Sequence, residues 1–487
     1  MLDRRHFQNI ALNISGMVLP MLVGLLVVPD LIHKLGTDRF GVLSISWVLV
    51  GYLGLLDLGL ARGLTQLLAK QTAAKVAPEI RASFARHVRR WMLSLGLGWV
   101  LLMLVLTPWI THTGLQMPDG LRSEATAGWF CIALSVPLFM WAASSIGVLE
   151  AYGRFTAVNA VRIPMGIATF LMPWGIAHWT THLGIVLGGL LCVRLAAAVA
   201  FATLSQRHFN GEKIVLDSST LREVLAFGSW LTVSNLVGPV LAYFDRFAIG
   251  ALLSMTAVTY YTVPFDVLSR LPSIPVAMMS VFFPMLTQAH GLDQKNSAQM
   301  TCMVFAANQL LVGFWVPGLI VCGLLGKSLL TWWVGAEIAQ ASYSVWAWIS
   351  VGVLINGFAH IPYTLLHSAG RTDLTAKFHI AELIPYLLAL WWALLNFGIV
   401  GAAAVWTLRV AFDTALMYAG VARLFPALRP SCVTAFAWTA GTAAVLTLGL
   451  YEVSKGPATL ISHPLLIVLA AILWSGYQLK KLLKNRL

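Results

Sequence analysis

The sequence predicts an all-α protein that crosses a membrane about fourteen times. Its composition and the recurrence of apolar runs both indicate this. Of the 487 residues, 59% are hydrophobic and only 10% are charged, whereas a soluble protein carries about 25% charged residues. Apolar runs of the roughly 20 residues that a membrane helix needs recur along the whole chain. The longest polar interruption, at residues 70–90, leaves no room for a soluble domain.

Fourteen helices follow from these runs, with ends placed to within a few residues. They cover 10–32, 41–68, 91–113, 125–149, 157–178, 184–205, 223–250, 257–287, 302–326, 342–366, 375–396, 399–421, 432–452 and 463–480. Arg4 and Arg5 precede the first run, as in a signal peptide, but the run is too long for one and lacks a cleavage site. We therefore expect an uncleaved first helix. The five cysteines lie in apolar runs without paired spacing and are expected to be buried small hydrophobes.

The distribution of Lys and Arg predicts the orientation of the chain. With the N-terminus inside, most of them fall on cytoplasmic segments, above all on residues 70–90 and on the last eight residues. The net charge of +13 then reflects the positive-inside rule, and no nucleic-acid partner is expected. Both termini are predicted to lie in the cytoplasm.

The stretch 31–68 opens with a polar turn, predicted at 33–40, and continues as one long apolar helix. That helix contains two charged residues, Asp57 and Arg62. A charge at membrane depth costs about 2.5–3.5 kcal/mol on insertion scales, so it normally faces a protein interior or a watery cavity.

Three short motifs repeat along the chain at a nearly constant spacing. Gly153-Arg154 recurs as Gly370-Arg371, Gly184 recurs as Gly398, and Arg194 recurs as Arg409. Each pair lies at the same place in the order of helices. An even number of helices per copy gives the two copies the same orientation in the membrane, a layout found in transporters with a central cavity.

Several segments resemble the Wzx-type oligosaccharide flippases. The segments are IHKLGTDRFGVLS at 32–44, GYLGLLDLGLAR at 51–62, YFDRFAIGALLS at 243–254, YYTVPFDVLSRL at 260–271, FFPMLT at 282–287 and WWVG at 332–335. This family belongs to the superfamily that also includes multidrug exporters and the peptidoglycan-precursor flippase. The resemblance implies two parallel six-helix lobes in a V that alternate between inward- and outward-open states. The expected lobes are 1–222 and 223–430, with 431–487 forming two additional helices.

An anionic substrate accounts for the arginines of the membrane segments, because a guanidinium matches phosphate oxygens in two-pronged geometry. The candidates for binding the diphosphate of a lipid-linked substrate are Arg62, Arg194, Arg270 and Arg409. The alternative for Arg270 and Arg409 is a neutralising pair within one helix, with Asp266 and Asp413 four residues away. Arg194 has no acid near it in the sequence.

The carboxylates of the membrane segments are candidates for ion coupling or gating, because such groups mark ion relays. They are Asp57, Glu382, Asp266 and Asp413, with the pair Asp245 and Arg246 expected to gate the outer end of its helix. We expect no metal ligands, no cofactor and no catalytic residues. The sequence GLLGKS at 323–328 lacks the first glycine of a phosphate-binding loop, so nothing indicates use of ATP.

We therefore predict a flippase, not an enzyme, in the bacterial inner membrane. The resemblance implies that it moves undecaprenyl-diphosphate-linked repeat units by alternating access for lipopolysaccharide or exopolysaccharide synthesis. A polysaccharide polymerase and assembly proteins are the expected partners, besides membrane lipids. The alternatives are an ion-coupled multidrug exporter, against which the six membrane arginines argue, and a membrane glycosyltransferase or polymerase, against which the short outer loops argue.

Overall fold

The computed structural model describes residues 4–53, 57, 59–209, 238, 240–289 and 294–454. All regular elements in these residues are helices, which confirms the all-α class. Ten segments of the described residues are long and apolar enough to cross a membrane. Two predicted helices, 463–480 and most of 223–250, lie outside the described residues. The chain divides into two compact units, Met1–Thr259 and Tyr260–Leu487, whereas the lobes 1–222 and 223–430 rest on the repeat and stay a prediction.

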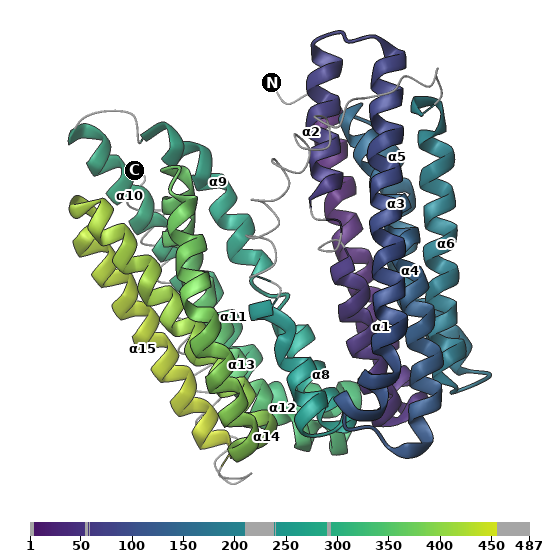
Figure 1. Cartoon of the computed structure of the whole chain (residues 1–487). Helices are drawn as coiled ribbons and strands as arrows, with labels where there is room; N and C mark the ends of the chain where they lie inside the picture. Colours follow the sequence, from purple (N-terminus) through teal and green to yellow (C-terminus); the bar gives the residue numbers. More distant parts are fainter. Residues whose placement is uncertain are drawn as a thin grey trace. The chain divides into compact units, whose positions relative to one another are not determined.

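Unit 1 is built around one buried helix, α4. Its helices are α1 (Arg4–Tyr52), α2 (Leu60–Ala73), α3 (Pro78–Trp109), α4 (Asp119–Ala151), α5 (Phe155–Ala177) and α6 (Leu183–Ser205), drawn in purple to blue in Figure 1. A π-helical turn, Ile110–Gly114, extends α3. Helix α4 packs against α2, α3 and α6, while α1 packs along α5. The most apolar stretch of α4 is 61% buried, as expected for a helix that is covered by protein rather than lipid.

The chain reverses direction inside α1 at a single residue, Gly36. Its backbone has φ 77° and ψ 164°, a left-handed region that only glycine enters easily. Gly24 and Trp47, on either side of this point, both lie against Phe170 of α5, so the two arms run side by side. The predicted turn over 33–40 is therefore wrong in extent, because the polar residues around Gly36 are helical.

The predicted single helix over 41–68 is also wrong. Helix α1 ends at Tyr52, and α2 begins at Leu60. Gly59 precedes α2 with φ 75°, which an uninterrupted helix does not allow. The segment between the two helices contains Asp57.

Hydrogen bonds hold the last ten residues of unit 1, 250–259, against the rest of that unit. Thr256 Oγ1 donates to Asp38 Oδ1 at 2.6 Å, and Thr259 Oγ1 donates to the carbonyl of Thr37 at 2.6 Å. The N–H of Gln116 donates to the carbonyl of Gly250 at 2.8 Å. These bonds attach residues 250–259 to both α1 and the α3–α4 connection.

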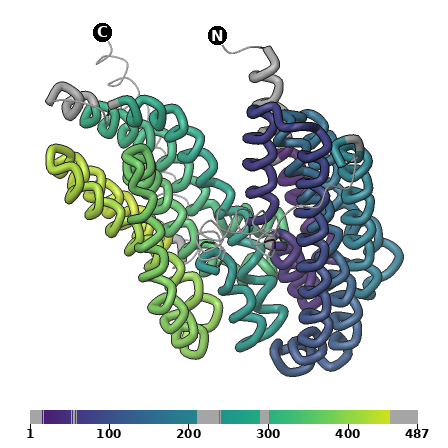
Figure 2. The backbone as a smooth tube through the Cα atoms, turned by 45° about the horizontal axis from the view of Figure 1, so that its top comes forward, coloured from purple at the N-terminus to yellow at the C-terminus, as the bar shows by residue number. Residues whose placement is uncertain are grey.

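Unit 2 is likewise built around one buried helix, α13. Its helices are α8 (Met255–Leu268, which begins in unit 1), α9 (Ser273–Ala289), α10 (Gln294–Leu310), α11 (Val316–Leu324), α12 (Gly326–Val334), α13 (Ala336–Ser368), α14 (Thr372–Leu424) and α15 (Arg429–Ser454). A π-helical turn, Leu311–Trp315, joins α10 to α11. Helix α13 packs against α9, α12, α14 and α15, and Figure 2 shows the green and yellow helices of this unit side by side. The most apolar stretch of α13 is 83% buried.

Of two predictions for the helices of unit 2, one is wrong and one is confirmed. The predicted helix 257–287 is divided into α8 and α9 by a turn that contains Pro272. The predicted break between 396 and 399 is confirmed, because Gly398 interrupts α14 with φ 59° and ψ −144°. Gly401 lies directly against the carbonyl of Ala393, so the chain folds back at Gly398. We call the two parts of α14, before and after Gly398, its first and second arms.

Candidate functional site

The same turn leads into both copies of the repeated motif. Gly153 and Gly370 have φ 69° and 72°, and their N–H groups donate to the carbonyl three residues earlier at 2.9 and 3.0 Å. The next residues, Arg154 and Arg371, have φ/ψ of −85°/51° and −94°/45°. Each of these arginines donates its N–H to the carbonyl five residues earlier, at 2.8 and 2.9 Å. The two turns therefore share one backbone conformation, and α5 and α14 begin at equivalent residues.

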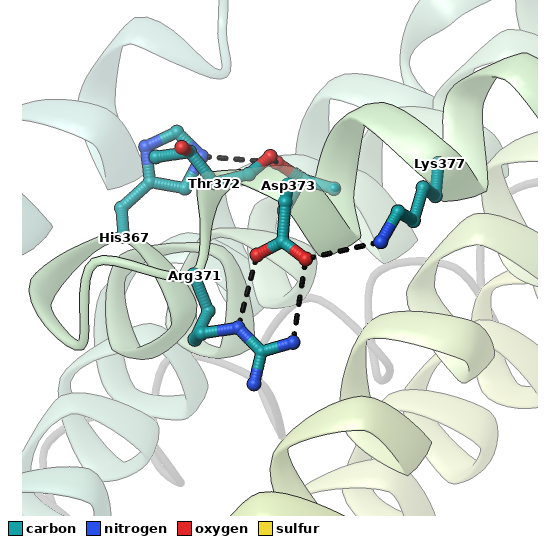
Figure 3. Close-up of polar contacts among 6 residues, drawn as sticks. His367, Arg371, Thr372, Asp373 and Lys377 are labelled. Atoms are coloured by element: carbon teal, nitrogen blue, oxygen red, sulfur yellow. Dashed lines mark hydrogen bonds and ion pairs between the residues drawn. The ribbon is translucent and has the colours of Figure 1, made fainter.

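In the second copy, polar side chains secure this turn. Arg371 Nε lies 2.9 Å from Asp373 Oδ1, and Lys377 Nζ lies 3.3 Å from Asp373 Oδ2 (Figure 3). His367 Nε2 and Thr375 Oγ1 are 3.2 Å apart. Arg371 lies outside the membrane-spanning segment, and its hydrogen bond to Asp373 raises the pKa of Arg371. These residues lie at the end of α13, in the turn and in the first two turns of α14, away from the charges deeper in α14.

Four titratable side chains meet between the two arms of α14. Arg409 Nη1 lies 3.6 Å from Glu382 Oε2, and His379 Nε2 lies 3.6 Å from Asp413 Oδ1. His379 and Glu382 come from the first arm, and Arg409 and Asp413 from the second. We call these four residues the α14 cluster. The side chain of Glu382 is only 1% exposed and that of Asp413 is 9% exposed, whereas that of His379 is 30% exposed, so the two acids are buried within unit 2 and the histidine lies at the edge of the cluster.

This arrangement corrects the alternative that paired Arg409 with Asp413 within one helix. The guanidinium of Arg409 faces Glu382 of the opposite arm and also lies 5.7 Å from the ring centre of Tyr386. Asp413 faces His379 instead. Arg409 therefore has a counter-ion, but from a helix arm that its sequence neighbourhood does not reveal.

The first copy of the repeat contains Arg194 in the place equivalent to Arg409. Arg194 lies on α6 and is partly buried, and its Nη1 contacts the sulfur of Met165 on α5 at 3.7 Å. Among the described residues, no carboxylate forms an ion pair with Arg194. Arg162, one turn before Met165, pairs at 3.3 Å with Glu150 near the end of α4.

The contact between Met165 and Arg194 corresponds to that between Glu382 and Arg409. Met165 and Glu382 are separated by the same spacing as Gly153 and Gly370. The same pair of positions is therefore in contact in each copy, with methionine beside the arginine in the first copy and glutamate beside it in the second. At the positions of His379 and Asp413, the first copy has Arg162 and Ala198. The first copy is therefore cationic at this level, and the second copy carries two acids.

Asp57 and Arg62 are not brought together as a binding pair. Asp57 is buried, and its carboxylate accepts hydrogen bonds from the N–H of Gly59 at 2.8 Å and of Ala61 at 3.2 Å. These bonds satisfy N–H groups at the beginning of α2, as a capping aspartate does. Arg62 is exposed on α2. A local structural function accounts for Asp57, while Arg62 stays a candidate for ligand contact.

The remaining predicted residues are Asp245, Arg246, Asp266 and Arg270. Asp245 and Arg246 are 0% and 2% exposed, and Asp245 Oδ1 accepts the N–H of Arg246 at 2.8 Å. The guanidinium of Arg246 lies 4.9 Å from the ring centre of Tyr243. Asp266 is half-buried on α8, and Arg270 is exposed in the turn after that helix. The burial of Asp245 and Arg246 is compatible with the gating role predicted for them.

Comparison with known proteins identifies the family. The family described as "Polysaccharide biosynthesis protein" matches residues 7–290. The chain belongs to this family. Its resemblance to polysaccharide exporters, predicted from short motifs at 32–44 and 243–271, is thereby confirmed.

Relatives of this polysaccharide biosynthesis protein include transporters. A putative O-antigen transporter of Shigella flexneri is 25% identical over 412 residues, which cover 84% of this chain and 96% of the relative. The lipid II flippase MurJ, in an inward closed conformation, is similar in fold, with a TM-score of 0.72, 13% identity, and coverage of 98% and 99%. An inward-facing multidrug transporter of the MATE family, in the MOP superfamily, has a TM-score of 0.65, 13% identity, and coverage of 89% and 98%. The solved structures show a shared fold, while the O-antigen transporter relative and the ten candidate membrane-spanning segments of the described residues support a multi-pass membrane transporter.

Two functional features of this family member were missed from the sequence. The pairing of His379 with Asp413 joins residues from different arms of α14. Met165, which faces Arg194, carries no charge, and nothing in the sequence distinguishes it from the other methionines of a chain that has 16. The spacing between the two copies could have revealed both features, if it had been applied to every charged position of the second copy.

Proposed function

We propose that this protein moves an undecaprenyl-diphosphate-linked oligosaccharide from the cytoplasmic to the outer leaflet of the bacterial inner membrane. Membership of the polysaccharide biosynthesis family and the name of the O-antigen transporter relative support this substrate class. The fold shared with a lipid II flippase and with multidrug transporters supports alternating access between two lobes. Transport of this kind forms no covalent bond, so we expect no enzymatic activity.

The observation that carries the proposal is that Arg194 forms no ion pair with a carboxylate of the described residues. Arg194 is partly buried, and a charge that is removed from water is normally paired, because leaving it unpaired is destabilising. In the second copy, Glu382 provides that partner, but in the first copy the equivalent residue is Met165. A diphosphate supplies two or more negative charges and oxygen acceptors that suit a guanidinium fork. We therefore assign the main diphosphate contact to Arg194.

The other candidate arginines have different parts in this proposal. Arg409 is already paired with Glu382, so it would contact the diphosphate only after leaving that partner. Arg62 and Arg270 are exposed, which suits an initial encounter with the anionic headgroup. The inner-membrane location and the cytoplasmic termini remain part of the proposal.

The test is polymer export in a strain that lacks the gene, with the membrane level of each variant measured. Arg194→Ala removes a hydrogen bond to a charged group, which contributes about 1.5–3 kcal/mol, equivalent to about 10- to 150-fold in affinity for the diphosphate, and should therefore lower export. Arg194→Lys keeps the charge but loses the two-pronged geometry, so its export should lie between wild type and Arg194→Ala. Full export by Arg194→Ala at a normal protein level would refute this assignment.

A matched control comes from the same hairpin. Arg162→Ala removes an arginine that is half-exposed and already paired with Glu150, so it should lower export much less than Arg194→Ala. A multidrug exporter would behave differently: deletion of the gene would then sensitise the cells to cationic drugs and leave polymer export intact.

A further inference from the structure

The α14 cluster holds more negative than positive charge. Two carboxylates, Glu382 and Asp413, share one permanent cation, Arg409, and one histidine that is charged only when protonated. The ion pairs of the two carboxylates among the described residues are those to Arg409 and His379. With His379 neutral and both acids ionised, the cluster therefore has a net charge of −1.

Burial makes this imbalance costly. The side chain of Glu382 is 1% exposed, that of Asp413 is 9% exposed and that of Arg409 is 14% exposed. Neither carboxylate oxygen of Glu382 accepts a hydrogen bond from the described residues. An uncompensated buried charge is destabilising, so the buried cluster needs one additional positive charge.

Within the part of the chain that the structure describes, the helices packed against α14 form no further ion pair with these carboxylates. Helix α13 brings His360, Tyr363 and His367, and has no acid beyond the exposed Glu337 in its first turn. Helix α15 brings Cys432 and begins at Arg429, and residues 426–428 have no titratable side chain. Helix α8, which reaches the second arm through Phe265 and Trp406, carries Asp266. Lys377 on α14 itself is paired with Asp373.

A metal ion is a poor candidate for the missing charge. The described residues contain no group of three or more His, Cys, Asp or Glu side chains placed to hold one. A guanidinium directly against Glu382 also repels a second cation and occupies one side of the carboxylate. A proton needs no such ligand shell, and histidine and buried carboxyl groups both accept one near neutral pH.

The first copy of the repeat shows that the fold does not require these acids. The hairpin of α5 and α6 has Met165 where α14 has Glu382, and Ala198 where α14 has Asp413. Nevertheless, Met165 and Arg194 make the equivalent contact. The two acids are therefore specific to the second copy and are not needed to close a hairpin of this shape.

We propose that the α14 cluster, formed by His379, Glu382, Arg409 and Asp413, is a binding site for one exchangeable proton. When the proton is bound, two carboxylates are balanced by Arg409 and by the proton. When it leaves, Glu382 and Asp413 compete for Arg409, and the contact between the two arms loses one of its two ion pairs. The site goes beyond the proposed function, because it exists whichever anion is transported.

The experiment counts protons on the purified full-length protein without substrate. The protein is titrated from about pH 8 to pH 5, the range in which such a site exchanges its proton, and proton uptake is measured per chain. Glu382→Gln and Asp413→Asn each remove one acid and leave a balanced cluster, so each should take up one proton fewer than wild type. Arg409→Gln should shift uptake in the opposite direction.

The control is Glu337→Gln, which removes an exposed glutamate of the same unit. Glu337 lies in the first turn of α13 and is not part of the α14 cluster, so this variant should match wild type. Each variant is compared only if it elutes as a single species, and Glu382→Gln, which keeps size and shape, decides the matter if Arg409→Gln does not fold.

Two results would overturn the proposal. The first is equal proton uptake by wild type, Glu382→Gln and Asp413→Asn. The second is a proton uptake that sodium chloride suppresses and choline chloride does not, because the exchangeable ion would then be sodium. Neither result depends on export, so a failure here leaves the assignment of Arg194 untouched.

Discussion

Replacing Met165 with glutamate should strongly reduce export while leaving Arg194 in place. The second copy of the repeat shows what this substitution creates, because Glu382 occupies the equivalent position and pairs with Arg409 at 3.6 Å. The sulfur of Met165 already lies 3.7 Å from Arg194 Nη1. A carboxylate at residue 165 would therefore reach the guanidinium and compete with an anionic substrate for it.

The magnitude follows from this separation. Two unit charges about 3.6 Å apart interact by about 4–5 kcal/mol at an effective dielectric constant of 20. Desolvation offsets part of this, and a hydrogen bond to a charged group retains about 1.5–3 kcal/mol. A substrate that must displace the new glutamate loses that amount, which is equivalent to about 10- to 150-fold in affinity.

The assay is polymer export by the complemented deletion strain, with Met165→Gln as the matched control. Glutamine has nearly the shape and polarity of glutamate but no charge, so Met165→Gln should retain most of the export. If Met165→Glu exports as well as Met165→Gln at equal membrane levels, then Arg194 does not bind the transported anion.

Three further predictions concern the scaffold. Gly41→Ala should lower the stability of the purified protein by about 1–3 kcal/mol, because a Cβ there would meet the carbonyl of Met255; Gly98→Ala, which meets nothing within 4 Å, should not, and a destabilised Gly98→Ala with an unaffected Gly41→Ala would contradict the packing. Asp57→Ala should lower the free energy of unfolding by about 0.5–2 kcal/mol, whereas Asp57→Asn should keep most of the stability and of the export. Loss of export in both variants at normal stability would instead indicate ion coupling. A cysteine introduced at Ala77, in a background without the five native cysteines, should react with impermeant reagents from the cytoplasm only, and labelling from the periplasm would invert the predicted orientation.

The sequence determined the fold class and the break at Gly398, but it misplaced the turns of the first helices. The high proportion of apolar residues identifies membrane helices directly. The break at Gly398 was predicted because Gly398 matches Gly184, which begins the predicted helix 184–205. The polar residues around Gly36 were assigned to a long turn because their hydrogen-bond partners could not be known. Asp38 accepts from Thr256, which lies at the opposite end of unit 1 in the sequence. Arg39 pairs with Glu124 at 2.8 Å, so these polar residues can be helical.

The candidate site was predictable only in part for a similar reason. Charges at membrane depth stand out in an apolar chain, and Arg194, Glu382, Arg409 and Asp413 were all recognised as unusual. Which of them meet depends on the reversal at Gly398, which brings residues 382 and 409 together across two arms. Spacing along one helix favoured Asp413 as the partner of Arg409. Glu382 of the facing arm pairs with Arg409 instead, because the reversal at Gly398 lays the two arms against each other.

The shared turn at Gly153 and Gly370 makes the two hairpins interchangeable parts. Their backbones enter the hairpin with the same conformation, and the contact between the facing positions is retained although one pair is apolar and cationic and the other ionic. The backbone conformation of the hairpin therefore does not depend on the charges that its side chains carry. An ancestral gene that doubled such a unit could change the cargo of one half and the energetics of the other by point substitutions, and a chimera carrying α5 and α6 twice would be the modern test of that history.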